Sequence, residues 1–184
     1  MKRMEQEKRL EAMLFAAGEP VHYSRLASII GEDAETVRRI LRRLADSYEE
    51  NDSALDITEL DGHWQICTRH QYANDIKTLL DTTRDTVLSP AALEVLALVA
   101  YNQPVTRAFI DQVRGVDSSH TLQRLIQIDL VEEAGRLELP GRPISYKTSL
   151  HFLRSFGIGN IQELPSVQVL EGPQRQEAQN EEDE

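Results

Sequence analysis

An internal duplication constrains the fold of this chain more than any other feature of its sequence. A shift of 84 positions aligns identical residues of the two halves in the same order: Ala16 with Ala100, Pro20 with Pro104, Val21 with Val105, Gly31 with Gly115 and Leu41 with Leu125. A shift of 80 positions aligns a threonine and two large apolar residues: Thr68, Tyr72 and Ile76 with Thr148, Phe152 and Phe156. The common order of these matches indicates two copies of one structural unit.

The first copy predicts three helices followed by a β-hairpin. Apolar residues recur at helical spacing in three stretches: Leu10, Met13, Leu14 and Ala17; Leu26, Ile29 and Ile30; Val37, Ile40, Leu41, Leu44 and Tyr48. Ser24 and Asp33 are suitable N-caps for the second and third helices, and Gly31 ends the second. Alternating apolar residues then flank Asp61-Gly62, which is a strong signal for a two-residue hairpin turn.

The second copy repeats this order. Ser89 as N-cap and Pro90 at the first helical position predict where its first helix begins, and Thr106 and Asp117 are predicted to cap the next two. The three apolar faces are Leu93, Leu96 and Val99; Phe109, Ile110 and Val113; and Thr121, Leu122, Leu125 and Ile128. A second hairpin follows with a longer loop: strands at Leu130–Val131 and Ile144–Tyr146, joined by Gly135 to Pro143.

Three small helices, the last two joined by a tight glycine turn, followed by a hairpin, are typical of a winged helix-turn-helix. The expected fold is mainly α with small β-hairpins (α+β), arranged as two tandem winged helix-turn-helix domains at 7–85 and 86–165. The boundary is placed at 81–88, which lacks helical periodicity. Residues 166–184 carry six acidic side chains and one basic one, so we expect a disordered acidic C-terminal tail there.

The composition predicts a cytoplasmic protein. The chain of 184 residues has a formal net charge of −11, and its longest apolar run, Val95–Tyr101, spans seven residues. A membrane-spanning helix needs roughly twenty apolar residues, so we expect no membrane segment. Acidic residues soon follow the basic start, which argues against a secretory signal. The single cysteine, Cys67, excludes a disulfide-stapled secreted scaffold.

Residues that could carry catalysis or bind a metal are scattered along the sequence. No two of the five histidines stand three or four residues apart, the spacing that places two ligands on one helix face: His22, His63, His70, His120 and His151. Cys67 lies in an alternating strand pattern and is interpreted as a structural thiol. We therefore predict no catalytic residue, metal, cofactor or small-molecule substrate.

Four arginines on the predicted third helix of the first copy leave a DNA-binding regulator open as an alternative: Arg38, Arg39, Arg42 and Arg43. This helix of a winged helix-turn-helix commonly enters the major groove, where arginines could contact phosphates. The competing interpretation is a solvated face paired with Glu35, Asp46 and Glu49. The acidic net charge favours the second interpretation, because neutralisation of phosphates drives nonspecific DNA affinity.

The second copy resembles segregation and condensation protein B, the ScpB family. The resemblance is carried by LSPAALEVLALVAYNQPVTRAFIDQVRGVDSSHTLQRL at residues 88–125. It continues through the predicted wing and final helix, at Pro140–Pro143, Tyr146–Ser149 and Phe152–Gly157, and covers the first copy more loosely at 10–15 and 18–21. Together the similar stretches span roughly residues 7 to 165.

This resemblance implies a non-enzymatic accessory subunit of the bacterial SMC condensin-like complex, acting in chromosome condensation and partition during cell division. The implied partners are a second copy, bound through the N-terminal domain, and the kleisin ScpA, bound through the C-terminal domain. The SMC ATPase would be reached through ScpA, and chromosomal DNA only indirectly, at the nucleoid.

The predicted wing of the second copy offers candidate kleisin contacts: Leu137, Leu139, Arg142 and Tyr146. Apolar, aromatic and arginine side chains of this kind dominate protein interfaces. For self-association, we expect the surface of the first helix and the strand that carries Trp64 to contribute.

Overall fold

A computed structural model describes residues 2–80 and 87–166, which we call the N-terminal and C-terminal halves. The N-terminal half contains these elements in order: α1 (Lys2–Ala17), β1 (Val21–His22), α2 (Tyr23–Ile30), α3 (Ala34–Glu50), β2 (Leu55–Leu60), β3 (His63–Thr68), the 3₁₀ helix η1 (His70–Tyr72) and α4 (Ala73–Leu79). The predicted boundary at 81–88 falls mostly outside the described residues, and the predicted tail does so from residue 167 onward.

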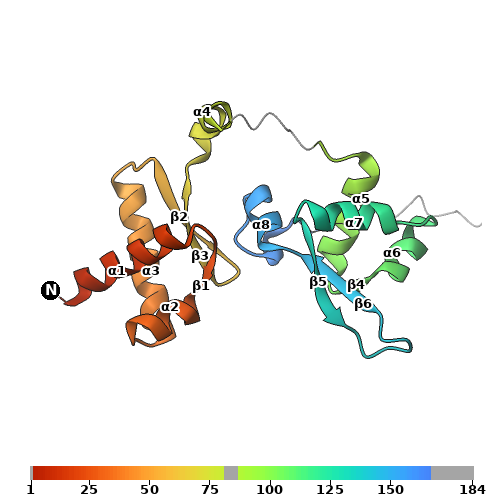
Figure 1. The fold of residues 1–184 in the computed structure, drawn as a ribbon, viewed down its shortest axis with the longest axis horizontal. Coiled ribbons are helices and arrows are strands. Elements are labelled where there is room, and N and C mark those ends of the chain that lie inside the picture. Colours follow the sequence, from red (N-terminus) through yellow and green to blue (C-terminus); the bar gives the residue numbers. More distant parts are fainter. Residues whose placement is uncertain (1, 81–86, 167–184) are drawn as a thin grey trace, which may run out of the picture.

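The C-terminal half repeats this order from its first helix through its hairpin, so the mixed α+β fold expected from the duplication is confirmed (Figure 1). Its elements are α5 (Pro90–Asn102), β4 (Val105–Thr106), α6 (Arg107–Arg114), α7 (Ser119–Gln127), β5 (Val131–Arg136), β6 (Ile144–Thr148), α8 (Leu150–Phe156) and the 3₁₀ helix η2 (Ile161–Glu163). No helix among the described residues is both long enough and apolar enough to cross a membrane.

Each predicted hairpin is part of a three-stranded antiparallel sheet. The strand orders are β1-β3-β2 and β4-β6-β5, with Val21 opposite Trp64 and Val105 opposite Tyr146. The hairpin turn at Asp61-Gly62 is confirmed, and both residues have the positive φ values, 46° and 75°, that a type I′ turn requires. The edge strands β1 and β4 were not predicted, because two residues are too short to show alternation.

Most predicted helix ends are confirmed by hydrogen bonds. Asp33, Ser89 and Thr106 each accept a backbone N–H three residues ahead. The prediction that Ser24 caps α2 was wrong: the helix begins at Tyr23, and the imidazole of His22 accepts from the Ser24 N–H. In the C-terminal half, α7 begins at Ser119, whose N–H donates to Asp117.

Each half has its own hydrophobic core, formed where the helices pack on the sheet. Leu10, Leu14, Val37 and Leu41 are among the most deeply buried residues of the first core, and Val95, Val99, Ile110, Leu125 and Phe152 of the second. Five residues of the predicted apolar faces are exposed instead: Ala17, Ile29, Leu93, Phe109 and Val113. Helical spacing shows which side of a helix is apolar, but it does not show how much of that side the neighbouring elements cover.

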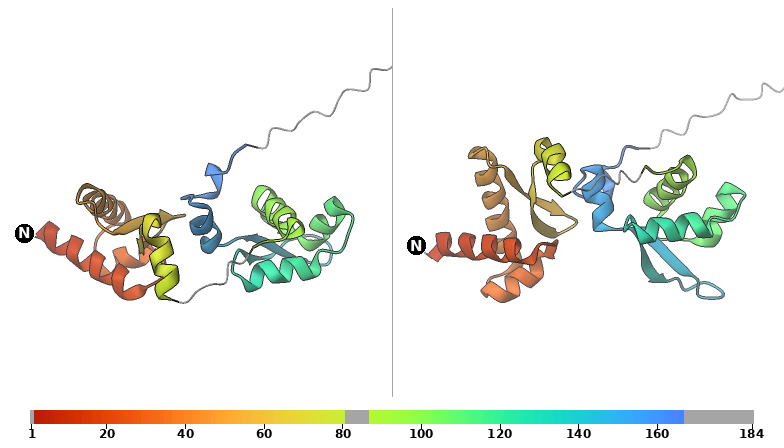
Figure 2. Two further views of the ribbon diagram at one scale, coloured as in Figure 1. Left: turned by 90° about the horizontal axis from the view of Figure 1, so that it is seen from above. Right: turned by 45° about the horizontal axis from the view of Figure 1, so that its top comes forward.

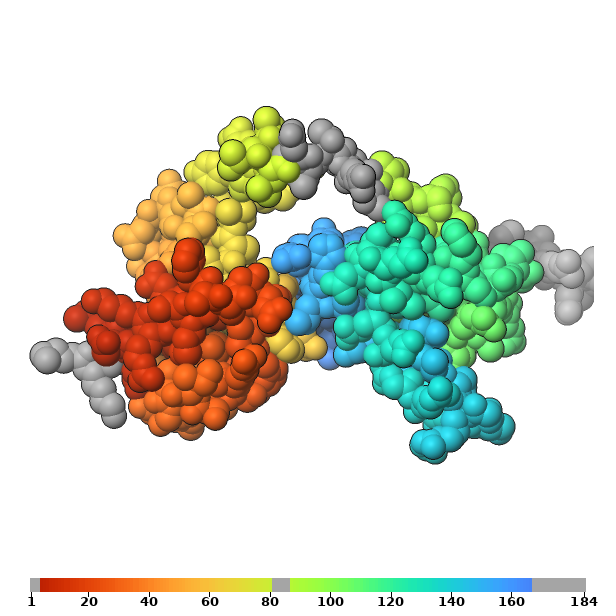
Figure 3. All heavy atoms as spheres, in the orientation of Figure 1, coloured from red at the N-terminus to blue at the C-terminus, as the bar shows by residue number. Residues whose placement is uncertain are grey.

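The two halves meet at the tip of the β2–β3 hairpin. Leu60, at the end of β2, is 2% exposed and packs within the core of the C-terminal half. The backbone N–H of Asp61 donates to the carbonyl of Gly159 over 2.8 Å. Both views of Figure 2 show α8 between the halves, and Figure 3 shows its region (blue) against the N-terminal half.

Candidate partner-binding surfaces

The β5–β6 hairpin is the most prominent projection of the C-terminal half, and its tip extends at the lower right of Figure 3. The Arg142 N–H donates to the Leu139 carbonyl over 2.8 Å, which closes a tight turn. Pro140 and Gly141, with φ 82°, stand where a type II turn favours proline and needs glycine. A second backbone bond, from Leu137 to Pro143, closes the base of this loop. Backbone hydrogen bonds therefore hold the loop at both its tip and its base.

The structure brings together three of the four predicted kleisin contacts. Leu137 is half-buried, Leu139 is 52% exposed, and the Arg142 guanidinium donates to Glu138 over 2.8 Å within the loop. Tyr146 does not join them: it lies in the central strand β6 and packs partly against the core. The sequence pattern placed Tyr146 in a strand, as the structure does, but it could not show that this strand is central and that the side chain packs on the core.

The four arginines of α3 are held largely by glutamates of neighbouring elements. Arg38 and Arg42 approach the two carboxylate oxygens of Glu59 at 3.6 Å and 3.8 Å, and Arg43 approaches Glu7 at 3.9 Å. Arg38 also contacts Glu35, and its guanidinium lies over the ring of Tyr23. Among the described residues, Arg39 has no hydrogen-bond or ion-pair partner and is exposed. The predicted pairing with Asp46 and Glu49 does not occur.

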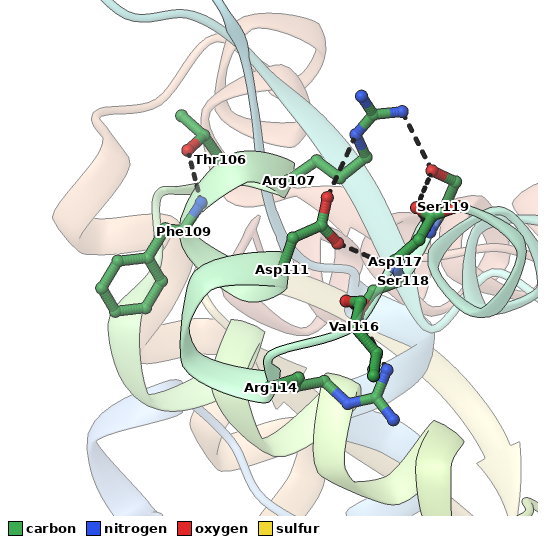
Figure 4. Close-up of polar contacts among 9 residues, drawn as sticks. All are labelled: Thr106, Arg107, Phe109, Asp111, Arg114, Val116, Asp117, Ser118 and Ser119. Atoms are coloured by element: carbon green, nitrogen blue, oxygen red, sulfur yellow. Dashed lines mark hydrogen bonds and ion pairs between the residues drawn. The ribbon is translucent and has the colours of Figure 1, made fainter.

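A polar network fixes the turn between α6 and α7 (Figure 4). The Asp111 carboxylate accepts the backbone N–H of Ser118 over 2.7 Å, and Arg114 donates to the Ser118 hydroxyl over 2.8 Å. Arg107 donates to Ser119 and lies 3.7 Å from Asp111. Ser118 is fully buried, so this network satisfies its backbone and side-chain polar groups. These side chains hold the helices together, and only Arg107 is largely exposed.

An apolar groove of about 1030 Å³, which sequence reasoning missed, runs between α5, α6 and the segment after η2. Leu98 and Tyr101 line it from α5, Val113 from α6, and Leu164 from the following segment. The signal that could have revealed it is the uninterrupted apolar run in α5. Only one side of a helix can pack on the core. When a helix carries apolar residues on all sides, those on the other sides are free to make another contact.

Perturbed titratable groups lie far apart and have structural causes. Burial, then the hydrogen bond to Glu11, raises the pKa of Tyr48 to about 12. Hydrogen bonds from Thr36 and Ser119 lower the pKa values of Asp33 and Asp117. Within residues 2–80 and 87–166, no three His, Cys, Asp or Glu side chains gather as metal ligands would. The three shifts therefore reflect local burial and hydrogen bonding.

Comparison with known proteins identifies the family. The family model described as "Segregation and condensation complex subunit ScpB" matches residues 8–167. Segregation and condensation protein B of Caldanaerobacter subterraneus is 41% identical over 165 residues, covering 90% of this chain and 98% of its own length. The chain belongs to the ScpB family. It is therefore related to subunits of a segregation and condensation complex, and ScpB is not a known enzyme family.

Other ScpB proteins align over similar lengths. The protein of Lachnoclostridium phytofermentans is 39% identical over 161 residues, covering 88% of this chain and 85% of the relative. A crystal structure of ScpB from Mycobacterium tuberculosis is 34% identical, covers 86% of this chain and 98% of that one, and has a TM-score of 0.42. The resemblance read from the second copy is therefore confirmed at the level of the family.

Proposed function

We propose that this chain is a non-enzymatic accessory subunit of an SMC condensin-like complex in the cytoplasm, associated with the nucleoid and acting in chromosome condensation and partition. It binds the kleisin ScpA through a C-terminal winged helix-turn-helix domain at 86–165 and reaches SMC only through ScpA. A second winged helix-turn-helix domain, at 7–85, forms a homodimer. The single observation that carries this proposal is the match to the ScpB family over residues 8–167.

The loop at the tip of the β5–β6 hairpin, residues 137–143, is the surface that we assign to ScpA, and we call it the wing loop. It is closed by backbone hydrogen bonds, and Arg142 is held by Glu138, so little conformational freedom is lost when a partner binds. Leu139 places a large apolar side chain at the tip with half of its surface exposed. A hydrogen-bonded loop with an exposed leucine at its tip suits a protein groove better than solvent.

Calorimetric titration of the full chain with ScpA tests this assignment. Leu137→Asp together with Leu139→Asp is expected to weaken binding by roughly thirtyfold or more, the effect of losing an interface hot spot. The matched control is Leu93→Asp, on α5 of the same half, because Leu93 is 49% exposed and Leu139 is 52% exposed. Unchanged affinity in a loop variant with a native circular dichroism spectrum would reject the assignment.

The self-association surface is assigned to α1. Phe15 is 74% exposed there and Met4 is 63% exposed, whereas Trp64 is buried in the central strand β3 and offers no surface. Phe15→Asp is expected to convert a dimer to a monomer in light scattering. Ile29→Asp, which is in the same half and at a 54% exposed position, should leave the dimer intact. A monomeric unmodified chain at micromolar concentration would contradict the proposal.

Direct DNA contact by α3 is not part of this proposal. Arg38, Arg42 and Arg43 already face glutamates, so phosphates would have to compete with these partners. Each phosphate contact would add about 0.9 to the salt slope of DNA affinity. We expect Arg39→Gln together with Arg43→Gln to change that slope by less than this amount. A larger drop would favour the DNA-binding alternative.

A further inference from the structure

His151 on α8 lines a cavity of about 260 Å³ to which both halves of the chain contribute. Glu19 and Pro20, in the turn before β1, line it from the N-terminal half. Asp129, just before β5, and Arg154 of α8 line it from the C-terminal half. A change in the charge of His151 therefore acts on side chains of both halves.

The hydrogen bonds of His151 fix its protonation state. Nη2 of Arg154 lies 2.7 Å from Nδ1 of the imidazole. A guanidinium has N–H donors and no acceptor, so Nδ1 accepts this bond, and the imidazole is neutral with its proton on Nε2. Nε2 lies 3.5 Å from the Ser155 hydroxyl. A second proton would have to bind at Nδ1, and it would break the bond to Arg154.

The charges around the cavity are unbalanced while His151 is neutral. Three carboxylates and one cation line the cavity, and a second cation is paired with one of the carboxylates at 3.0 Å: Glu19, Asp129 and Glu132, with Arg154 and Lys147. No charged residue among the described ones lines the second cavity that His151 borders. Among residues 2–80 and 87–166, Glu19 has no hydrogen-bond or ion-pair partner. A proton on His151 would make the positive and negative charges equal in number.

The surroundings of His151 set the pH range of this change. Burial, and then the charge of Arg154, lowers the pKa of His151 below its ordinary value of 6.5, whereas Asp129 raises it. The imidazole therefore takes up its second proton in acid rather than at neutral pH. It then repels the guanidinium of Arg154, because two cations would lie at hydrogen-bond distance.

We propose that His151 is an acid-sensitive latch between the two halves. When Nδ1 takes a proton, the imidazole releases Arg154, whose guanidinium turns to the carboxylate of Glu19 across the cavity. Asp129 then faces the imidazolium, and the new ion pair joins α8 to the turn before β1. The wing loop does not line this cavity, so the latch does not depend on the contact with ScpA.

Hydrogen exchange of the Asp61 amide, followed by NMR on the full chain, tests the proposal. This N–H donates to the carbonyl of Gly159 and so reports on the contact between the halves. Its protection, corrected for the intrinsic pH dependence of exchange, is measured from about pH 7.5 to about pH 5.5. Acidification should raise the protection by roughly twofold to fivefold, the size of an exposed ion pair.

Two variants should each abolish this rise. His151→Gln retains an acceptor for Arg154 but takes up no proton, and Glu19→Gln removes the new partner of Arg154. Glu19 is exposed, so its variant tests the latch without disturbing a core. The matched controls are His120→Gln on α7 and Glu133→Gln on β5, because both residues are exposed in the same half as His151 and neither lines the cavity. The rise should persist in both controls.

Three results would overturn the latch. The first is protection of the Asp61 amide that does not rise on acidification of the unmodified chain. The second is a rise that persists in Glu19→Gln, or in His151→Gln with a native circular dichroism spectrum. The third is a rise that disappears in either control, since the acid effect would then come from the overall charge of the chain.

Discussion

The two halves share one order of elements but stabilise it differently. The turn between the second and third helices shows this most clearly. In the N-terminal half, Ala27 and Ile30 are buried and the turn is held by apolar packing. The duplicate positions, 84 residues later, are Asp111 and Arg114, which hold the same turn by hydrogen bonds to Ser118. The same helix–turn–helix backbone can therefore be stabilised either by buried apolar side chains or by a hydrogen-bonded polar network.

The last helices differ even more. Phe152 on α8 is 2% exposed, whereas its counterpart Tyr72 is 37% exposed, and none of the side chains of α4 is buried. In Figure 1, α4 stands away from α1 to α3, and α8 lies between the halves. The N-terminal half therefore relies on three helices and a sheet for its core, and the C-terminal half relies on four helices and a sheet.

The largest expected effect tests this contrast directly. Phe152→Ala should lower the free energy of unfolding by about 3–5 kcal/mol, because it opens a cavity in a closed core. Tyr72→Ala, at the duplicate position, should change it by no more than about 0.5 kcal/mol. Urea unfolding of both variants measures the difference. Equal losses would show that the η1–α4 segment is packed as closely as α8.

A similar test asks whether one strand serves two cores. Leu60→Ala should cost about 2–5 kcal/mol and loosen the C-terminal half, whose core contains its side chain. Ile57→Ala, three residues earlier on β2, should loosen the N-terminal half, because Ile57 is buried there. Hydrogen exchange resolves the two halves. If both variants loosen only the N-terminal half, Leu60 is not part of the other core.

The polar turn of the C-terminal half gives a smaller expected effect. Asp111→Ala should cost about 1–3 kcal/mol, since the buried Ser118 N–H loses its acceptor. Arg107→Ala is the control within the same network. Its side chain is 58% exposed, so the loss should stay near 0–1 kcal/mol. Thermal unfolding compares the two variants, and equal losses would contradict a turn fixed by Asp111.

The smallest effect concerns acid. Asp33 and Asp117 are duplicate positions, and hydrogen bonds lower the pKa of both carboxylates in the folded chain. Their contribution to stability is therefore present above the ordinary pKa, near 3.8, and is lost as the pH falls through the lowered value. Asp33→Asn and Asp117→Asn should each flatten this loss. Unfolding midpoints measured from neutral to acidic pH check it, and unchanged acid sensitivity would contradict it.

Local chemistry explains which parts of the fold could be predicted. Helix starts at Asp33, Ser89 and Thr106 and the turn at Asp61-Gly62 depend on neighbours within a few residues, so the sequence shows them. The strand β1 depends on pairing with Trp64, which is 43 positions from Val21. No local pattern encodes a partner at that distance.

The same limit applies to the candidate surfaces. The wing loop was predicted because its glycines and prolines punctuate the sequence, and the pairing of Arg38 with Glu59 was missed because Glu59 lies on another element. Exposure of Val113 was also missed, since helical spacing cannot report that no described side chain covers it. Surfaces formed between elements become visible only when those elements are placed in space.

The contact of Leu60, Asp61 and Gly159 makes the C-terminal half incomplete on its own. Leu60 belongs to a strand of the first sheet but is buried in the second core. A fragment that begins after residue 80 would lack this side chain and would leave a gap where it packs.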